Sequence, residues 1–535
     1  MGNSRNINSA FIVWLVSIFI LSLAGMVVIK ETTRFGAGLR PDSYSYISAA
    51  ENIVEGRGYA RPSGPEDLTP ITNFPPLYSY SIALIHFFGM EAYSSARILC
   101  GLFFGWTLLL VGVGLKVVTK SFYWSLYGTL LILSSPVLIE LYSYAHSEPL
   151  YLVLTLFGFV LLSVYSTTKD QPILLGAAGL MIGGMVMTRY IGVSAVIAGV
   201  LVIWVIAVRS KWRRWQYLPS LFFGLLAVSP VTVFLVRNYY VTGNMTNRPA
   251  PYWHPPDMEQ WEAARNSILR WFIPLPFDES TSSITAWIAF SILLLVLFGV
   301  MLYAFRTGLR LMTDDKSGTT FLSLHSSYFF LYLSLLIATV FAFDALTPLN
   351  ERLLSPLILS AIMVVVSLFA RWWEMFGRIG RIGLFVIGAY LLTNNLIQST
   401  QRVQYLRDTP QGIASPIYQS SQTIEYVRGR PEELIYTNNI PALYFWADRK
   451  AMAIPSRSNP FDPNGLDLSD YSSSLENMRT NILRQHAILV IIGSNPRGRL
   501  EQEHWTEITR GLVITAEYQD GIVFESPETE PPAVE

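Results

Sequence analysis

The sequence contains little charge. Only 14% of its 535 residues are charged, whereas a soluble protein carries about 25%. The missing charge leaves repeated apolar runs of about 20 residues, which is the length needed to cross a hydrocarbon core of ~30 Å. The composition therefore excludes an ordinary soluble domain and predicts a chain that crosses a membrane several times.

Excess charge of one sign and paired cysteines are also lacking. Lys plus Arg and Asp plus Glu balance at 38 each, so no overall field indicates a nucleic acid or an acidic substrate. The single cysteine, Cys100, cannot form an internal disulfide and gives no information on the redox compartment. No small-residue cleavage site follows the first apolar run, and we expect residues 9–29 to be a retained helix.

About eleven apolar segments are candidate membrane spans, with boundaries uncertain by several residues. They are residues 9–29, 97–117, 122–143, 149–167, 172–188, 190–208, 216–236, 284–305, 326–344, 353–370 and 382–400. Together they predict an α-helical polytopic membrane protein.

Basic residues are distributed unevenly between the connections. With the N-terminus inside, fourteen lie on the cytoplasmic side, against only Arg189 and Arg352 in the short external turns. The fourteen are Arg5, Lys116, Lys120, Lys169, Arg209, Lys211, Arg213, Arg214, Arg306, Arg310, Lys316, Arg371, Arg378 and Arg381. This positive-inside bias predicts that the N-terminus is cytoplasmic and that loops 30–96 and 237–283 lie outside.

Two helices are expected in the first external loop. Residues 43–55 are compatible with a helix capped by Ser43. Residues 77–89 are apolar but too short to span comfortably, and their Tyr and Ser content favours a helix in the membrane interface.

After residue 400 the composition changes. Apolar runs at 433–436 and 487–493 are typical of buried strands, and 417–428 and 499–510 are expected to be helical. We predict a transmembrane domain over 1–400, a small extracytoplasmic α/β domain over 401–525, and a disordered acidic, Pro-rich tail over 526–535.

Ionisable residues near the outer ends of spans are functional candidates, because such groups are costly there. They are Asp42, the turn His146-Ser147-Glu148-Pro149, Arg189, Arg237-Asn238-Tyr239-Tyr240, and Asn350-Glu351-Arg352. Structural roles are the alternatives. Arg189 could snorkel to headgroups, Glu148 could complement a helix dipole, and residues 350–352 could form a local ion pair.

The ordered set of motifs resembles the GT-C glycosyltransferases. The resemblance is to the branch with protein O-mannosyltransferases, the aminoarabinose transferase of lipid A and their bacterial relatives. It rests on residues 42–46, 56–59, 75–78, 97–99, 147–150, 188–190, 237–240 with 243–244, and 352–357. It covers residues 9–400, and the C-terminal domain is similar to domains appended to bacterial relatives.

This resemblance implies a polyprenyl-phosphate-linked sugar donor and reaction on the outer face. It also implies that Asp42 takes the place of the catalytic acid in the first loop of the family. Many members carry a second acidic residue beside that Asp, whereas here the neighbours are Pro41 and Ser43. No cofactor is certain. A divalent metal is possible, and its ligands would be Asp42, Glu148 and His146.

We therefore predict an inverting glycosyltransferase of the inner membrane. Its catalytic residues are Asp42, as general base on an acceptor hydroxyl, and Glu148, while Arg237, Arg352 and, less directly, Arg189 hold the phosphate of the donor. The other substrate-binding candidates are Tyr44, Tyr46, Tyr78, His146, Asn238 and Glu351. The tyrosines could instead belong to an interfacial belt, and His146 could be structural.

Partners are expected to be the lipid-linked donor, the bilayer and a lipid, glycan or protein acceptor, with no nucleic acid. Three alternatives stay open at this point. The chain could be a flippase or transporter of lipid-linked sugars, although it lacks the related halves typical of transporters. It could be a glycan ligase or polymerase that uses a diphosphate-linked oligosaccharide, or a non-catalytic scaffold for envelope assembly.

Overall fold

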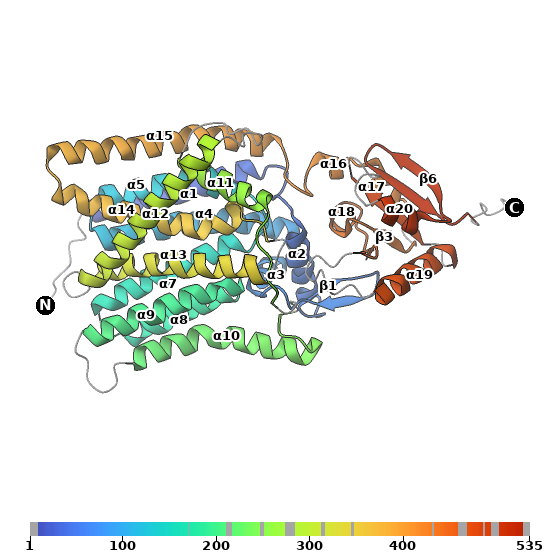
Figure 1. Cartoon of the computed structure of the whole chain (residues 1–535), viewed down its shortest axis with the longest axis horizontal. Coiled ribbons are helices and arrows are strands. Elements are labelled where there is room, and N and C mark those ends of the chain that lie inside the picture. The colour runs from blue at the N-terminus through green and yellow to red at the C-terminus, as the bar shows by residue number, and fades with distance from the viewer. Residues whose placement is uncertain are drawn as a thin grey trace. The chain divides into compact units, whose positions relative to one another are not determined.

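A computed structural model describes residues 9–168, 171–209, 217–246, 251–272, 284–311, 316–343, 347–430, 433–457, 468–484, 487–493 and 502–527. The chain forms two compact units (Figure 1). The first comprises residues 1–34, 72–81 and 94–408, and the second comprises residues 35–71, 82–93 and 409–535. Each unit is described by itself below.

The first unit is a bundle of helices (Figure 1). Its elements are α1 (Ser9–Thr32), α4 (Ala92–Thr119), α5 (Phe122–Leu133), α6 (Pro136–Tyr142), α7 (Glu148–Thr168), α8 (Pro172–Val186), the 3₁₀ helix η1 (Tyr190–Gly192), α9 (Val193–Arg209), α10 (Leu218–Thr242), α11 (Met258–Phe272), α12 (Ile284–Leu311), α13 (Lys316–Ala342), α14 (Glu351–Met375) and α15 (Arg378–Asp408).

The helices confirm a multi-pass membrane protein. Within the described residues, nine helices are long and apolar enough to cross a bilayer. The pair α5–α6, bent by 62°, would be a tenth span, and α8 is a shorter apolar helix. Each of the eleven predicted segments therefore contains helix. The bend has a local cause, because Ser135 caps α6 and Pro136 opens it, where a missing N–H costs least.

Burial separates central from peripheral helices. The apolar stretch of α14 is 89% buried and that of α7 is 72% buried, whereas the values for α12 and α15 are 22%. Small residues allow the close approaches. A Cβ on Gly183 of α8 would lie 3.0 Å from the carbonyl oxygen of Ala227 in α10, so glycine lets these two backbones touch. The helices with the most apolar exposure are those that lipid must cover.

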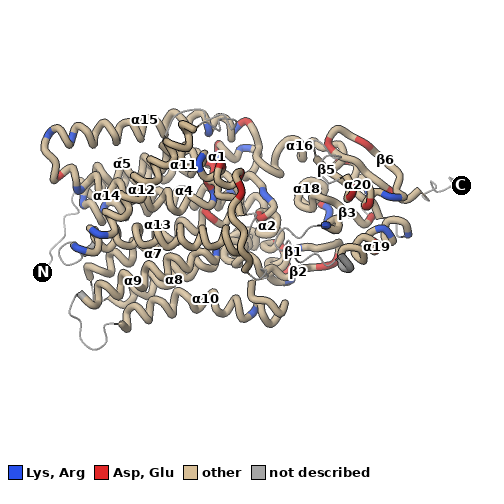
Figure 2. The backbone as a smooth tube through the Cα atoms, in the orientation of Figure 1, with Lys and Arg blue, Asp and Glu red and all other residues tan. Residues whose placement is uncertain are grey.

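Basic residues gather at the end of the bundle where α14 turns into α15, with few acidic residues beside them, whereas the other end carries basic and acidic residues together and the middle is almost free of charge (Figure 2). Of the fourteen basic residues predicted on one side, Arg5, Lys169, Lys211, Arg213 and Arg214 lie outside the described residues.

The second unit contains a five-stranded mixed sheet with the order β4-β3-β5-β7-β6. Its strands are β3 (Ile435–Thr437), β4 (Met452–Ala453), β5 (Ile488–Ile492), β6 (Val513–Tyr518) and β7 (Gly521–Glu525). β3 runs parallel to β4 and β5, and β7 runs antiparallel to β5 and β6. The helices are α16 (Pro416–Gln419), α17 (Gln422–Arg428), α18 (Ile440–Trp446), α19 (Leu468–Arg484) and α20 (Gln502–Thr509).

The sheet buries an apolar core, as the sequence predicted for 433–436 and 487–493. Every residue of β5 and β7 is buried. Met478 and Ile482 of α19 pack with Leu489, Ile491 and Phe524 of the sheet. This is the small α/β domain, and the predicted tail at 526–535 lies outside the described residues from position 528 onward.

Residues of the first loop belong to the second unit. They form α2 (Pro41–Val54) and an antiparallel hairpin of β1 (Ala60–Pro62) and β2 (Leu68–Pro70), and they are followed by α3 (Leu77–His86). The two helices expected over 43–55 and 77–89 are thus present. The hairpin between them was not predicted.

Specific contacts hold α2 against the C-terminal residues. Leu39 forms a β-bridge with Gly412, and the Tyr444 hydroxyl donates a hydrogen bond to Glu51. The Tyr44 ring meets the Tyr444 ring edge-on, with centroids 4.9 Å apart. Burial raises the pKa of the Glu51 carboxyl, while the Tyr444 hydrogen bond opposes that rise.

The structure thus divides the chain differently from the sequence prediction. That prediction placed loop 30–96 in a domain ending at residue 400. In the structure α15 continues to Asp408, and most of the loop groups with residues 409–535. The physical reason is that aromatic side chains of the loop pack on aromatic side chains near residue 444.

Gly412→Ala should destabilise the second unit by more than ~2 kcal/mol. Gly412 has φ +63°, and a Cβ there would lie 2.0 Å from the Leu39 carbonyl oxygen. The left-handed conformation alone costs an L-residue about 1–2 kcal/mol. The measurement is the thermal unfolding of the full chain in detergent.

Gly511→Ala is the matched control, because Gly511 has φ +83° but nothing within 4 Å of the added methyl group. The difference between the two variants reports the Leu39 contact. Equal losses in both variants would contradict the close approach of Leu39.

Candidate active site

Glu148, the first residue of α7, is the centre of a cluster of charged side chains. It is 1% exposed. Its Oε1 atom accepts from Arg189 Nη1 and from Arg352 Nε. No other described basic residue pairs with it. A carboxylate at the first turn of a helix also complements the helix dipole, so Glu148 has this structural role in addition to its two ion pairs.

The two arginines come from distant segments. Arg189 follows α8 in extended backbone and precedes η1, and its Nη1 also lies 3.5 Å from the Ser147 hydroxyl. Arg352 is the second residue of α14. The cluster therefore joins the ends of three helices, α7, α8 and α14. The sequence analysis placed Glu148, Arg189 and Arg352 near the outer ends of membrane spans, and the structure brings these three side chains together.

The cluster has a net charge of +1. The side chains of Arg189 and Arg352 are 21% and 15% exposed. Guanidinium groups present several N–H donors in a plane, and this geometry matches carboxylate and phosphate oxygens. Two guanidinium groups sharing one carboxylate oxygen at the end of a membrane bundle form an arrangement that favours an additional anion.

Tyrosine hydroxyls extend the polar groups from the cluster into the bundle. The Tyr332 hydroxyl donates to the carbonyl oxygen of Leu353, 2.9 Å away. Tyr151, one turn after Glu148, has its hydroxyl 2.8 Å from the Tyr328 hydroxyl. All three rings are buried. Sequence analysis did not single them out, because tyrosines inside apolar runs give no signal of the partners that they meet.

Glu351 pairs with a further residue that the sequence analysis missed, Arg270 of α11. The Arg270 Nη1 atom lies 3.1 Å from Glu351 Oε1. Glu351 was considered as part of a local pair within 350–352, and the structure corrects this, because its partner comes from a different helix. The only available signal was the amphipathic pattern of residues 258–272, with a basic residue at its end.

An apolar cavity of about 130 Å³ lies within the same unit. It is lined by side chains from α5, α6, α11, α12, α14 and α15, among them Trp271 beside Arg270. Ile358, another lining residue, lies six residues after Arg352, or about 9 Å along α14. The cavity therefore begins beside Arg270 and about 9 Å along α14 from Arg352.

Arg237 and Asn238 lie outside the Glu148 cluster. Arg237 Nη1 donates to Asn238 Oδ1 at 3.0 Å, and its guanidinium lies 6.0 Å from the Phe234 ring. Asn238 is fully buried, and its Nδ2 donates to the carbonyl oxygen of Met245 at 2.8 Å. This bond closes the turn after α10, so Asn238 has a structural role there.

His146 is buried and its ring stacks on Tyr144, with centroids 5.2 Å apart. In the part of the chain that the structure describes, no group of three or more His, Cys, Asp or Glu side chains is arranged to hold a metal ion. Glu148, one of the conditional ligands, already shares an oxygen between two guanidinium groups. The residues present therefore fit a phosphate better than a cation.

Asp42, Tyr44 and Tyr46 belong to α2 of the second unit. Asp42 lies in the first turn of the helix and is partly exposed. The Tyr44 hydroxyl donates to the carbonyl oxygen of Pro62 at 2.9 Å, and Tyr46 is 1% exposed. Tyr78 of the first unit is also buried. These tyrosine side chains are packed inside the protein and do not form an aromatic belt at a membrane interface. Their contact with substrate stays a prediction.

The fold of this chain is similar to that of solved membrane glycosyltransferases of the GT-C fold. The chain matches ArnT, the aminoarabinose transferase of Cupriavidus metallidurans, over 96% of its own length and 98% of that chain, with a TM-score of 0.55 and 11% identity. The same enzyme solved with undecaprenyl phosphate matches with a TM-score of 0.50 and 12% identity, over 97% of this chain and 98% of that chain.

The oligosaccharyltransferase AglB of Archaeoglobus fulgidus, solved with an inhibitory peptide and a dolichol-phosphate, has a TM-score of 0.52 and 10% identity. The match covers 89% of this chain and 69% of that one. Neither a protein-family model nor a curated protein matches the sequence. The predicted GT-C fold is confirmed by these structures, and at such low identity the likeness concerns the fold alone.

Glu148→Gln should lower the free energy of unfolding by about 3 kcal/mol, because it leaves two largely buried cations without their counter-charge. Glu140→Gln is the matched control. Glu140 pairs with Arg402 at 2.5 Å, but both side chains are 25–29% exposed and the expected loss is below about 1 kcal/mol. Thermal unfolding in detergent gives both values. Equal losses would contradict the central role of Glu148.

Proposed function

We propose that the protein is a glycosyltransferase that moves a sugar from a polyprenyl-phosphate carrier to an acceptor hydroxyl. The observation that carries the proposal is the pair of arginines on Glu148 in a GT-C fold, with an apolar cavity that begins about 9 Å along α14 from one of them, Arg352. A lipid phosphate requires cations for its head and apolar surface for its tail, and both occur in this bundle.

The donor phosphate would lie against Arg352 and Arg189. As the bond to the anomeric carbon breaks, negative charge grows on the departing phosphate, and guanidinium groups fixed in advance stabilise it. Arg270 is a further candidate, because it lies beside Trp271 at the cavity. Arg237 would contribute at longer range. The structures of ArnT with undecaprenyl phosphate and of AglB with dolichol-phosphate support a lipid-phosphate ligand for this fold.

Asp42 would act as the general base. It would take the proton of the acceptor hydroxyl while that oxygen attacks the anomeric carbon in line with the departing phosphate, which inverts the sugar configuration. Base catalysis of this kind contributes about 10²–10⁴-fold in rate. A carboxylate in the first turn of α2 is held by a helix rather than by a mobile connection. No step in this scheme requires a metal.

The reaction would take place on the extracytoplasmic face of the inner membrane. The basic residues at the α14–α15 turn support this orientation, because an excess of basic residues is typical of the cytoplasmic side (Figure 2). The end of the bundle that carries Glu148 would then be extracytoplasmic. The second unit and the N-terminus would then lie on opposite sides of the bilayer.

Asp42→Asn should reduce turnover at least 100-fold and leave donor binding unchanged, because the amide keeps the size of the side chain but accepts no proton. Asp67→Asn, the same change in the same loop segment, is the control and should retain activity. Transfer from a radiolabelled polyprenyl-phosphate sugar is the measurement. Wild-type turnover in the Asp42 variant would remove its assignment, and movement of intact labelled lipid across vesicles without product would favour a flippase.

Arg352→Ala should weaken binding of undecaprenyl phosphate by about tenfold or more, because a hydrogen bond to a charged group contributes about 1.5–3 kcal/mol. Arg237→Ala should have a smaller effect. Arg402→Ala breaks another inter-helix ion pair and is the control. Binding is measured by native mass spectrometry of the folded protein. If the Arg352 and Arg402 variants bind equally well, Arg352 does not hold the phosphate.

A further inference from the structure

A second basic site lies where α14 turns into α15. A pocket of about 380 Å³ opens there, lined by Trp373, Gly377, Arg378, Arg381, Ile382 and Phe385. Such a volume is typical of small-molecule sites. None of these residues takes part in the proposed transfer reaction.

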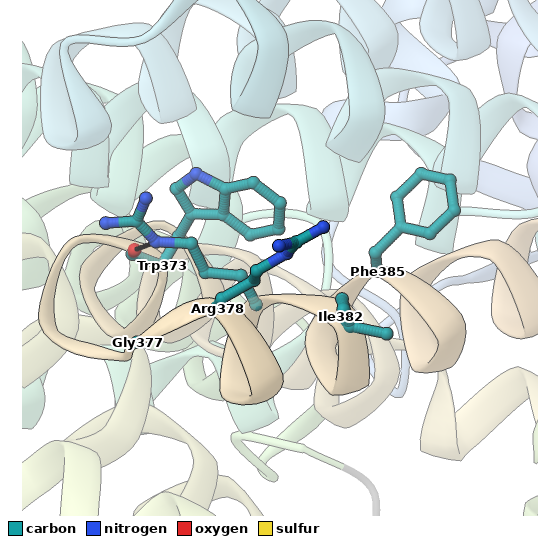
Figure 3. A pocket seen from close by; sticks show the side chains of 6 residues that line it. Trp373, Gly377, Arg378, Ile382 and Phe385 are labelled. Carbon is teal, nitrogen blue, oxygen red and sulfur yellow. Dashed lines mark hydrogen bonds between the residues drawn. The ribbon is translucent and has the colours of Figure 1, made fainter.

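The pocket presents two guanidinium groups. The Nε atom of Arg381 donates to the carbonyl oxygen of Trp373 at 2.8 Å, and its guanidinium lies 5.9 Å from that indole ring. This bond fixes the orientation of Arg381, and within the described residues its two terminal nitrogens form no hydrogen bond. Among the residues that the structure describes, the Arg378 side chain has no hydrogen bond or ion pair. In Figure 3 it extends toward the space between the rings of Trp373 and Phe385.

Local charge is not neutralised. Residues 371–385 contain three arginines, Arg371, Arg378 and Arg381, and one carboxylate, Glu374, and within the described residues no ion pair joins Glu374 to any of them. The turn therefore has a net charge of +2. An anion would reduce the repulsion between the guanidinium groups, and a phosphate would match their planar donors.

The same surface is strongly apolar. Ile379 is 87% exposed, Phe385 67% and Ile382 55%. A soluble phosphate would gain nothing from these side chains, whereas a phospholipid would cover them with its acyl chains while its phosphate met the arginines. Tryptophan beside basic residues is also typical of the boundary between headgroups and hydrocarbon.

The position on α14 places this pocket on the membrane face opposite the candidate active site. Arg352 and Trp373 are 21 residues apart on one continuous helix, which corresponds to about 32 Å. That length equals the hydrocarbon thickness of a bilayer. Both residues lie in the first unit.

We infer that this pocket binds the phosphate of one anionic phospholipid, with Arg378 and Arg381 as donors and the exposed side chains of α15 against its acyl chains. The headgroup would anchor the α14–α15 turn to its leaflet. This site is independent of the transfer reaction proposed above.

The test is native mass spectrometry of the delipidated full-length protein, titrated with dioleoylphosphatidylglycerol or with dioleoylphosphatidylcholine. The anionic lipid should bind more tightly. Arg378→Gln with Arg381→Gln should weaken its first binding step about 30-fold, because each basic residue at an anionic membrane surface contributes roughly a factor of five. The single variant Arg378→Gln changes an exposed side chain and should weaken this binding step about fivefold. It tests the site even if the double variant does not fold.

Arg306→Gln with Arg310→Gln is the matched control, since it removes two exposed arginines near the end of α12 that do not line the pocket. It should bind like the wild type. An equal loss in this control would show a general charge effect and overturn the site. Equal affinity for the two lipids, or complete displacement of the anionic lipid by millimolar inorganic phosphate, would also overturn it.

Discussion

The shared carboxylate of Glu148 is the interaction on which the helical unit depends. A charge that is 1% exposed is stable only if it is paired, and here two guanidinium groups meet one oxygen. Because Arg189 follows α8 and Arg352 belongs to α14, the pair fixes the ends of α7, α8 and α14 relative to one another. The same residues that satisfy the carboxylate leave a surplus positive charge, so the structural role and the proposed anion-binding role would belong to the same side chains.

The helix α14 connects the two functional proposals. It is the most buried membrane helix, with Arg352 at one end and Trp373 at the other. One end lies close to the apolar cavity and supplies a cation for a lipid phosphate in the proposed reaction. The other end supplies a basic, aromatic turn for a phospholipid of the opposite leaflet. A rigid central helix with a cation at each membrane face would hold the bundle at a fixed depth.

The sequence was sufficient for the spans and for part of the site. Apolar runs of 20 residues have few alternatives to membrane helices, and all eleven predicted segments contain helix. Glu148, Arg189 and Arg352 were recognised separately, because charges near span ends are costly. Their pairing could not be predicted, since it depends on which helices are neighbours. The same limit explains why Arg270 was missed, because its partner lies 81 residues away.

The grouping of loop 35–71 with the C-terminal residues also required the structure. Nothing in the pattern around Glu51 and Tyr44 indicates Tyr444 as a partner, because the contact spans almost 400 positions. The aromatic side chains of this loop pack within their own unit. From the sequence alone they could not be distinguished from aromatic residues of an interfacial belt. Asp42 as general base remains a chemical proposal, supported by its place in the first turn of α2.

A cryo-electron microscopy structure of the protein with bound undecaprenyl phosphate would show directly whether the two arginines on Glu148 hold the lipid phosphate. We expect the phosphate to lie within hydrogen-bonding distance, about 3 Å, of the Arg352 or Arg189 guanidinium. A phosphate bound at a place where neither arginine can reach it would show that these arginines are not its binding site.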